Sequence, residues 1–244
     1  MGIEIVTLAQ RPELHSAIWE MPTGWPPFML EDPVARLMGR LPTEFPELQF
    51  GALDGDEVVG YVHAASFAWD GDRDSLPDRG WDAIMLQAFR DHDRAQEPTA
   101  VTLLEAAVRP DRRGSGLSNA LLVGVRDRCR ELGYRVLFGP VRPTLKSLEP
   151  STPMAEYIAR LRPDGLPEDP WLRVHTRLGA QIVRIASASM TIGGSLAQWR
   201  TWTGLPFDRT GDVIVPGALV PVHVSVEHDH AVYVEPNVWM VHEL

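Results

Sequence analysis

The chain has 244 residues and a formal net charge of −10 at pH 7, so it is long enough to bury the core of one large domain. The acidic balance argues against a general binder of nucleic acids or of anionic membranes, since both partners favour basic surfaces. No apolar run reaches the length of a membrane span, and the first residues show no basic region followed by an apolar stretch. We therefore expect neither a nucleic-acid nor a membrane partner.

Cysteine and lysine are both rare in this chain. Cys129 is the single cysteine, which excludes an intrachain disulfide and fits a reducing compartment such as the cytoplasm. Lys146 is the only lysine among 23 basic residues, and such an excess of arginine is typical of proteins from GC-rich bacteria. The composition thus predicts a cytoplasmic, bacterial protein.

Hydrophobic periodicity and turn-forming residues predict the elements of the first part of the chain. In chain order we expect helices over 11–20 and 31–40, a hairpin over 48–65 around Asp54-Gly55-Asp56, a helix over 80–93, a strand over 101–108, a helix over 117–132 and a strand over 135–140. The helix over 117–132 has an apolar stripe at three- and four-residue steps and ends before Gly133, its members being Leu117, Leu121, Val125, Cys129 and Leu132.

The remaining third is less regular. Residues 141–168 are rich in proline and predict an irregular segment with one helical turn near 155–160, followed by a helix over 170–180. Ser195 and Gln198 form a capping box that opens another helix, which carries Trp199 and Trp202 as core residues or as a wall of the acceptor pocket. From about residue 213 the chain predicts strands, with 217–226 and 231–241 pairing through a turn at 227–230.

The centre of the chain therefore reads strand, glycine turn, helix, strand, which predicts a parallel pair with a right-handed crossover. Gly114 and Gly116 stand where the helix begins, and Arg109, Arg112 and Arg113 add positive charge. Free N–H groups at a helix start favour anions, so the junction predicts a phosphate site, or else a plain turn with solvated arginines. The Gly-Lys-Ser/Thr of a nucleoside-triphosphate loop is missing, and Asn119 replaces the third glycine of a dinucleotide fingerprint.

The stretch Val-Arg-Pro-Asp-Arg-Arg-Gly-Ser-Gly-Leu-Ser-Asn-Ala-Leu-Leu, at 108–122, resembles the acyl-CoA-binding motif of the GNAT superfamily of N-acetyltransferases. Arg113, Gly116 and Ser118 take the three motif positions, although the family prefers Gly or Ala at the third. The resemblance is close over 101–139 and looser to 180. It implies a single α/β domain over 1–244, with a mixed, mostly antiparallel central sheet and one parallel strand pair around the CoA-binding helix. Residues 1–100 and 181–244 would flank a CoA-binding core over 101–180.

The resemblance also implies which residues hold the acetyl-CoA co-substrate. The backbone of β-strand residues 106–108 would pair with the pantetheine arm, and Arg109 or Arg112 would meet the ribose phosphate. Backbone N–H groups would cradle the pyrophosphate. The cofactor-binding residues implied in this way are Ala106, Ala107, Val108, Arg109, Arg113, Gly114, Ser115, Gly116, Leu117 and Ser118.

Two side chains are candidates for acid–base chemistry. Strand alternation places Glu105 on one face with Val101, Leu103 and Ala107, where a carboxylate must be paired, neutral or functional. The family often has an acidic residue near this position, which takes a proton from the amine. His175 lies in EDPWLRVHTRLGA, at 168–180, where the family often has a tyrosine that protonates the departing thiolate. Both residues also have structural interpretations, as an arginine partner and as a helix-face histidine.

The expected activity is direct transfer of an acetyl group from acetyl-CoA to a primary amine of a small molecule or peptide. A non-catalytic acyl-CoA sensor remains an alternative. A metal-dependent protein is another, because His223, His228 and His230 gather near the C-terminus, although no complete ligand set is evident and we predict no metal. Cys129 fits an inert core thiol, the acidic segment 69–74 fits a solvated loop or an ammonium site, and the C-terminal strands leave a homodimer open.

Overall fold

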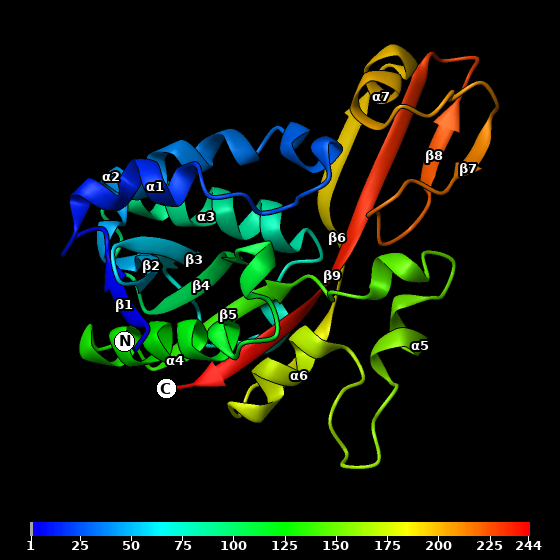
Figure 1. The fold of residues 1–244 in the computed structure, drawn as a ribbon. Coiled ribbons are helices and arrows are strands. Elements are labelled where there is room, and N and C mark those ends of the chain that lie inside the picture. Colours follow the sequence, from blue (N-terminus) through cyan, green and yellow to red (C-terminus); the bar gives the residue numbers. More distant parts are fainter. Residues whose placement is uncertain (1) are drawn as a thin grey trace.

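The computed structural model describes residues 2–244, and their strands form one nine-stranded mixed sheet (Figure 1). The strands are β1 (Glu4–Thr7), β2 (Gln49–Asp54), β3 (Glu57–Phe67), β4 (Ala100–Val108), β5 (Val136–Val141), β6 (Gln181–Gly194), β7 (Gly211–Val213), β8 (Val222–Ser225) and β9 (His230–Glu243). Their order is β1-β2-β3-β4-β5-β9-β8-β7, and β6 pairs with β9 beside this path. Within the described residues, β4 and β5 are the one parallel pair. The predicted mixed fold is confirmed.

Helices cover both faces of the sheet. They are α1 (His15–Trp19), α2 (Leu41–Glu44), α3 (Gly80–Asp93), α4 (Leu117–Glu131), α5 (Met154–Ile158), α6 (Pro170–Arg177) and α7 (Leu196–Thr203). In Figure 1, α1, α2 and α3 lie above the sheet and α4 and α6 below it, while α7 packs at the far end of the long strands β6 and β9. Among residues 2–244, every helix is too short or too polar to cross a membrane.

The predicted hairpin, the central strands and the helices over 80–93 and 117–132 are all present. The apolar stripe of α4 is confirmed for four of its five members, which are buried: Leu117, Leu121, Val125 and Cys129. Leu132 is 38% exposed, because the helix ends at Glu131 and the chain then turns through Gly133 at φ +89°. The capping box at Ser195 and Gln198 is also present, and Trp199 is fully buried.

Other predictions need correction. The helix expected over 31–40 is not an α-helix: Pro33 interrupts it, and its second half is a 3₁₀ segment, Ala35–Arg40. A separate 3₁₀ segment, Pro27–Glu31, precedes it. β1 and β6 were not predicted. β6 has β-branched residues in both halves, but its middle reads Ala186-Ser-Ala-Ser189, and its pairing with β9 is irregular between Ala186 and Met190. The sequence therefore shows no continuous strand pattern, and pairing with β9 joins the two halves into one strand.

β4 contains a bulge that sets the geometry of the centre. Its register with β3 pairs Glu105 with His63 and Leu103 with Ala64, so Leu104 is an extra residue. Directly paired residues share a face, and neighbouring β3 residues face opposite ways. Glu105 therefore shares a face with Ala107 but not with Leu103 or Val101 (paired with Ser66), and that part of the alternation argument was wrong.

β4 and β5 also separate. Their parallel pairing covers Val101 with Leu137 and Thr102 with Phe138, and from Leu103 onward the edge of β4 that faces β5 has no strand partner in the described chain. β5 continues instead along β9. The sheet is thus open between the C-terminal halves of two parallel strands.

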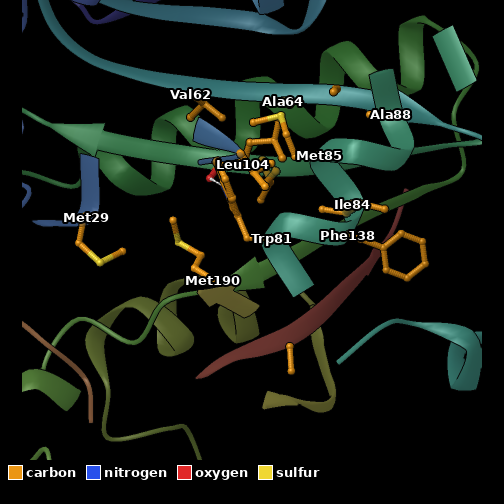
Figure 2. Close-up of a cluster of buried hydrophobic side chains, with 14 of the residues drawn as sticks. Met29, Val62, Ala64, Trp81, Ile84, Met85, Ala88, Leu104, Phe138 and Met190 are labelled. Carbon is orange, nitrogen blue, oxygen red and sulfur yellow. Dashed lines mark hydrogen bonds between the residues drawn. The ribbon is translucent and has the colours of Figure 1, made fainter. Parts of the chain in front are cut away.

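The N-terminal end of α3 supports this opening from one side. The Trp81 amide donates to Ser189 Oγ at 2.8 Å, and its indole N–H donates to the carbonyl of the bulge residue Leu104 at 2.8 Å. Figure 2 shows Trp81 beside Leu104 and Met190, with Met85 and Ile84 further along α3. Gly80 is required here, because a Cβ on it would lie 2.4 Å from Ser189 Oγ. The bulge is therefore held in place by a helix and does not depend on β4 alone.

Candidate active site

The start of α4 carries a set of unused backbone donors beside the opening. Within residues 2–244, the amide N–H groups of Gly114, Gly116, Leu117 and Ser118 make no hydrogen bond. Gly114 and Gly116 have φ of +80° and +86°, and a Cβ on either would meet no atom within 4 Å. Four free donors, a helix N-terminus and open space together fit a pyrophosphate group. The predicted cradle is therefore suited in this structure to the anionic part of acetyl-CoA.

The arginines of this segment already have partners. Arg109 forms ion pairs with Asp111 and Glu57, and Arg112 donates to Asp54. Arg113 donates to the backbone carbonyl of Thr23 at 3.0 Å, which ties the glycine turn to the N-terminal segment. Arg109 and Arg112 would have to exchange these partners to bind a ribose phosphate, so the backbone is the part of the cradle that is ready for a ligand.

The free edge of β4 leads from the cradle to Glu105. Ala106, Ala107 and Val108 lie on this edge, between the cradle and the carboxylate, and Ala106 and Val108 are half-buried. An exposed strand edge offers alternating N–H and C=O groups to an extended ligand, as the pantetheine arm of CoA would be. The opening between β4 and β5 is therefore a path from the phosphate cradle to an acidic side chain.

Glu105 is held by two donors on one of its oxygens. Its Oε1 accepts from the indole Nε1 of Trp25 at 2.5 Å and from the hydroxyl of Tyr61 at 2.6 Å. Its Oε2 accepts no hydrogen bond from residues 2–244 and is not sealed from solvent. Burial raises the pKa of Glu105, and the two donors lower it in part. One oxygen is thus fixed while the other is free to receive a proton.

Trp25, Tyr61 and Arg142 were not identified from the sequence. Trp25 lies between α1 and the 3₁₀ segment Pro27–Glu31, and Arg142 directly follows β5. The guanidinium carbon of Arg142 lies 5.5 Å from the Trp25 ring centroid, so one indole contacts both Arg142 and Glu105. Neither contact has a local sequence signal, because 80 residues separate Trp25 from Glu105.

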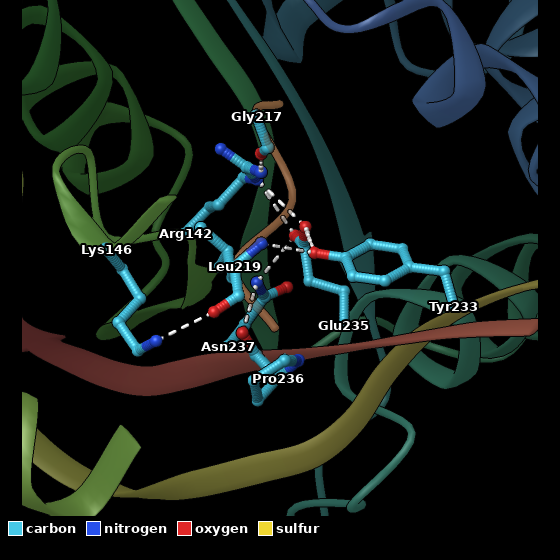
Figure 3. A network of polar contacts seen from close by, with 8 residues as sticks. All are labelled: Arg142, Lys146, Gly217, Leu219, Tyr233, Glu235, Pro236 and Asn237. Atoms are coloured by element: carbon cyan, nitrogen blue, oxygen red, sulfur yellow. Dashed lines mark hydrogen bonds and ion pairs between the residues drawn. The ribbon is translucent and has the colours of Figure 1, made fainter. Parts of the chain in front are cut away.

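Arg142 is fixed by a buried network (Figure 3). Its Nε lies 3.0 and 2.9 Å from the two carboxylate oxygens of Glu235, and its Nη2 donates to the Gly217 carbonyl at 2.5 Å. Glu235 is fully buried on β9 and also accepts from Tyr233 and Asn237. The network joins the end of β5, the loop at 217 and the middle of β9.

His175 is placed elsewhere by the structure. It lies on α6 and is 1% exposed, with Nδ1 at 2.9 Å from His242 Nε2 and its ring against Trp171. Burial lowers its pKa well below the ordinary range, so the imidazole is neutral near pH 7. No hydrogen bond joins it to Glu105 within residues 2–244. A neutral, enclosed histidine does not suit the predicted role of proton donor, and we assign His175 to the packing of α6 on β9.

The C-terminal histidines do not gather around one point. His223 pairs with Asp212 at 3.1 Å, and His228 contacts Ser225 at 2.7 Å. In the described chain the one group with metal-like spacing is Glu44, His92 and Asp93, and Arg40 forms ion pairs with both of its carboxylates. The metal alternative thus has no support from the predicted cluster. Cys129 is buried, and burial raises its pKa to about 12, which agrees with an inert thiol.

Comparison with known proteins supports the same interpretation. No family model matches the chain. A curated relative, the arginine N-acetyltransferase avaD of Aspergillus versicolor, is 31% identical over all of this chain and 94% of its own length. That relative is fungal, so it gives no support to the predicted bacterial origin.

Solved structures show the fold. The loading GNATL domain of CurA from Lyngbya majuscula aligns with a TM-score of 0.63 at 16% identity, over all of this chain and 98% of that domain. A GNAT-like decarboxylase, GphF, in complex with isobutyryl-CoA aligns with a TM-score of 0.58 at 17% identity, over 100% and 99% of the two chains. The fold, the open β4–β5 edge, the free amides of α4 and the similarity to a curated acetyltransferase agree: the chain belongs to the GNAT superfamily of N-acetyltransferases, enzymes that transfer an acetyl group from acetyl-CoA to an amine.

Proposed function

We propose that the acceptor is a small cationic amine and that Glu105 is the general base that accepts its proton. The observation that carries this proposal is the free Oε2 of a carboxylate whose pKa burial raises, located at the opening between β4 and β5. The curated relative is named for arginine, so arginine is the first acceptor to test.

The role of Glu105 follows from its charge and its supports. A primary amine is protonated near pH 7 and must lose a proton before its lone pair can attack a carbonyl carbon. A carboxylate beside it first attracts the ammonium group and then accepts the proton at Oε2. Tyr61 and Trp25 hold Oε1, so the side chain does not have to be ordered during the reaction.

The rest of the site would hold the acyl donor. The free amides of Gly114, Gly116, Leu117 and Ser118 would bind the pyrophosphate, and Ala106 to Val108 would align the pantetheine arm by strand-like hydrogen bonds. Acetyl-CoA supplies the reactive thioester when bound. Trp25 and Tyr61 would exclude water on the acceptor side, since they pack directly on Glu105.

The experiment is an acetyl-CoA titration followed by an acceptor screen. Calorimetry with acetyl-CoA, free CoA and ATP tests the cradle, and we expect saturable binding of the two CoA compounds alone. Mass spectrometry then follows acetylation of arginine, other amino acids and simple amines. Glu105→Gln should bind acetyl-CoA normally and turn over poorly, whereas Glu131→Gln, on the exposed end of α4, should match the parent. Binding without acetylation of any amine would favour the sensor alternative and contradict the proposal.

We further infer a cytoplasmic location from the lone, buried Cys129, which needs no oxidising compartment. Fractionation of the native host with a labelled chain checks this, and a secreted pool would contradict it.

A further inference from the structure

Arg142 is a charged side chain held rigidly beside the candidate active site. Its side chain is 18% exposed, and its partner Glu235 is 0% exposed. Burying such a pair costs desolvation energy that the attraction between the two charges offsets only in part. Stabilisation of the fold is therefore a weak explanation for why this pair is buried. Its position directly after β5 places it at the opening between β4 and β5. We therefore consider a role for this pair in ligand binding.

Glu235 leaves one side of the guanidinium unused. Nε and Nη2 are directed at Glu235 and the Gly217 carbonyl. Nη1 makes no hydrogen bond with residues 2–244 and is not sealed from solvent. In Figure 3, one terminal nitrogen of Arg142 points away from the other residues drawn. A guanidinium fixed on one edge and open on the other is a prepared site for a carboxylate.

Trp25 relates this site to the base. The indole donates to Glu105 through Nε1, and its ring lies 5.5 Å from the guanidinium carbon of Arg142. The free Oε2 of Glu105 and the free Nη1 of Arg142 therefore belong to groups of opposite charge that flank one indole ring. A ligand that carries both an ammonium group and a carboxylate is complementary to this pair.

We propose that Nη1 of Arg142 binds the carboxylate of the acceptor, so that the acceptor is an amino acid and not a simple amine. This inference rests on the proposed function and names the substrate class of that same site. Arg142 is a specificity-determining residue in this scheme: it touches the acceptor away from the reacting nitrogen. The buried network of Glu235, Tyr233 and Asn237 sets its orientation.

The test compares acceptors that differ only at the carboxylate. Arginine, arginine methyl ester and agmatine, which is arginine without its carboxylate, are each assayed with the parent enzyme at saturating acetyl-CoA. A lost charge-assisted hydrogen bond predicts kcat/KM lower by about tenfold or more for the ester and for agmatine, mostly through KM. Arg142→Lys keeps a positive charge beside Glu235 but has one terminal nitrogen where arginine has two. Because the nitrogen that would bind the acceptor carboxylate is lost, the variant should show a weaker preference for arginine over agmatine. Arg209→Lys, at a site 91% exposed, is the matched control.

The outcomes separate the two proposals. Equal kcat/KM for arginine and agmatine in the parent enzyme would overturn the role of Arg142 and leave acetyl transfer to amines intact. The same holds if the preference survives unchanged in folded Arg142→Lys. Acetylation of none of these amines by an enzyme that binds acetyl-CoA would refute the proposed function and the carboxylate site together. The comparison of acceptors in the parent enzyme decides the matter even if Arg142→Lys does not fold.

Discussion

Asp32 and Asp82 form a buried acidic pair whose removal should stabilise the protein in a pH-dependent way. Asp82 lies in the first turn of α3 and is 1% exposed, and Asp32, in the N-terminal segment, is 3% exposed. Burial and the neighbouring Asp32 raise the pKa of Asp82 from 3.8 to about 7. Asp32 Oδ1 accepts from the Val34 amide at 2.7 Å, while Asp82 has only a 3.4 Å contact with the exposed Arg79. Asp82 is therefore the member to replace.

The magnitude follows from the pKa. A rise of about three units corresponds to about 4 kcal/mol, at about 1.4 kcal/mol per unit. The folded state binds this proton more tightly than the unfolded chain does. The associated stability is therefore complete below about pH 4 and is lost as pH rises through about 7. Asp82→Asn removes the titration, and after allowance for the lost Arg79 contact we expect a gain of about 2–4 kcal/mol at high pH.

The assay is urea unfolding of the parent and Asp82→Asn at pH 5 and pH 8.5. The advantage of the variant in free energy of unfolding should be less than half as large at pH 5 as at pH 8.5, because at pH 5 only the first part of the fall between about pH 4 and about 7 has occurred. Asp208→Asn, at a carboxylate 64% exposed, is the control and should show no such change. A variant that is no more stable than the parent at pH 8.5, or that gains equally at both values, would refute the reasoning.

Three further predictions concern the active site. Gly116→Val should weaken CoA binding by tenfold or more, and it should cost about 1–2 kcal/mol of stability because φ is +86° there. Calorimetric titration of the folded variant with CoA checks this, and full affinity would count against the cradle. Glu105→Gln should reduce kcat by about 10²- to 10⁴-fold and abolish the fall in activity as pH drops through the raised pKa of Glu105; a persistent acidic limb would point to another base. His175→Gln should lower the unfolding temperature and leave the alkaline limb of the rate profile unchanged, and a shifted limb would restore His175 as the proton donor.

Local signals predicted the parts of the site that lie within one segment. The glycine turn, α4 and the two parallel strands follow each other along the chain, so spacing and composition indicate them together. Glu105 was found because a carboxylate in an apolar strand is unusual. The expected face of Glu105 was partly wrong, since the bulge at Leu104 depends on how β4 meets β3 and α3.

The acceptor side of the site could not be found in this way. Trp25 and Arg142 approach Glu105 from distant parts of the sequence, and each looks like an ordinary surface or core residue in its own segment. His175 occupies a position that the family resemblance marks as chemical, yet His242, which encloses it, is 67 residues away. Burial by remote residues decides the protonation state of these groups, and a linear pattern does not contain that information.

The bulge at Leu104 joins two stretches of β4 that each keep a regular register with β3. Leu103 pairs with Ala64 and Glu105 with His63, so removal of Leu104 would merge the two stretches into one regular ladder and leave Glu105 on the face that it shares with Tyr61. The same deletion would remove the carbonyl that accepts from the indole of Trp81. The length of β4 therefore sets how this strand meets α3, whereas the pairing with His63 sets the face of the base.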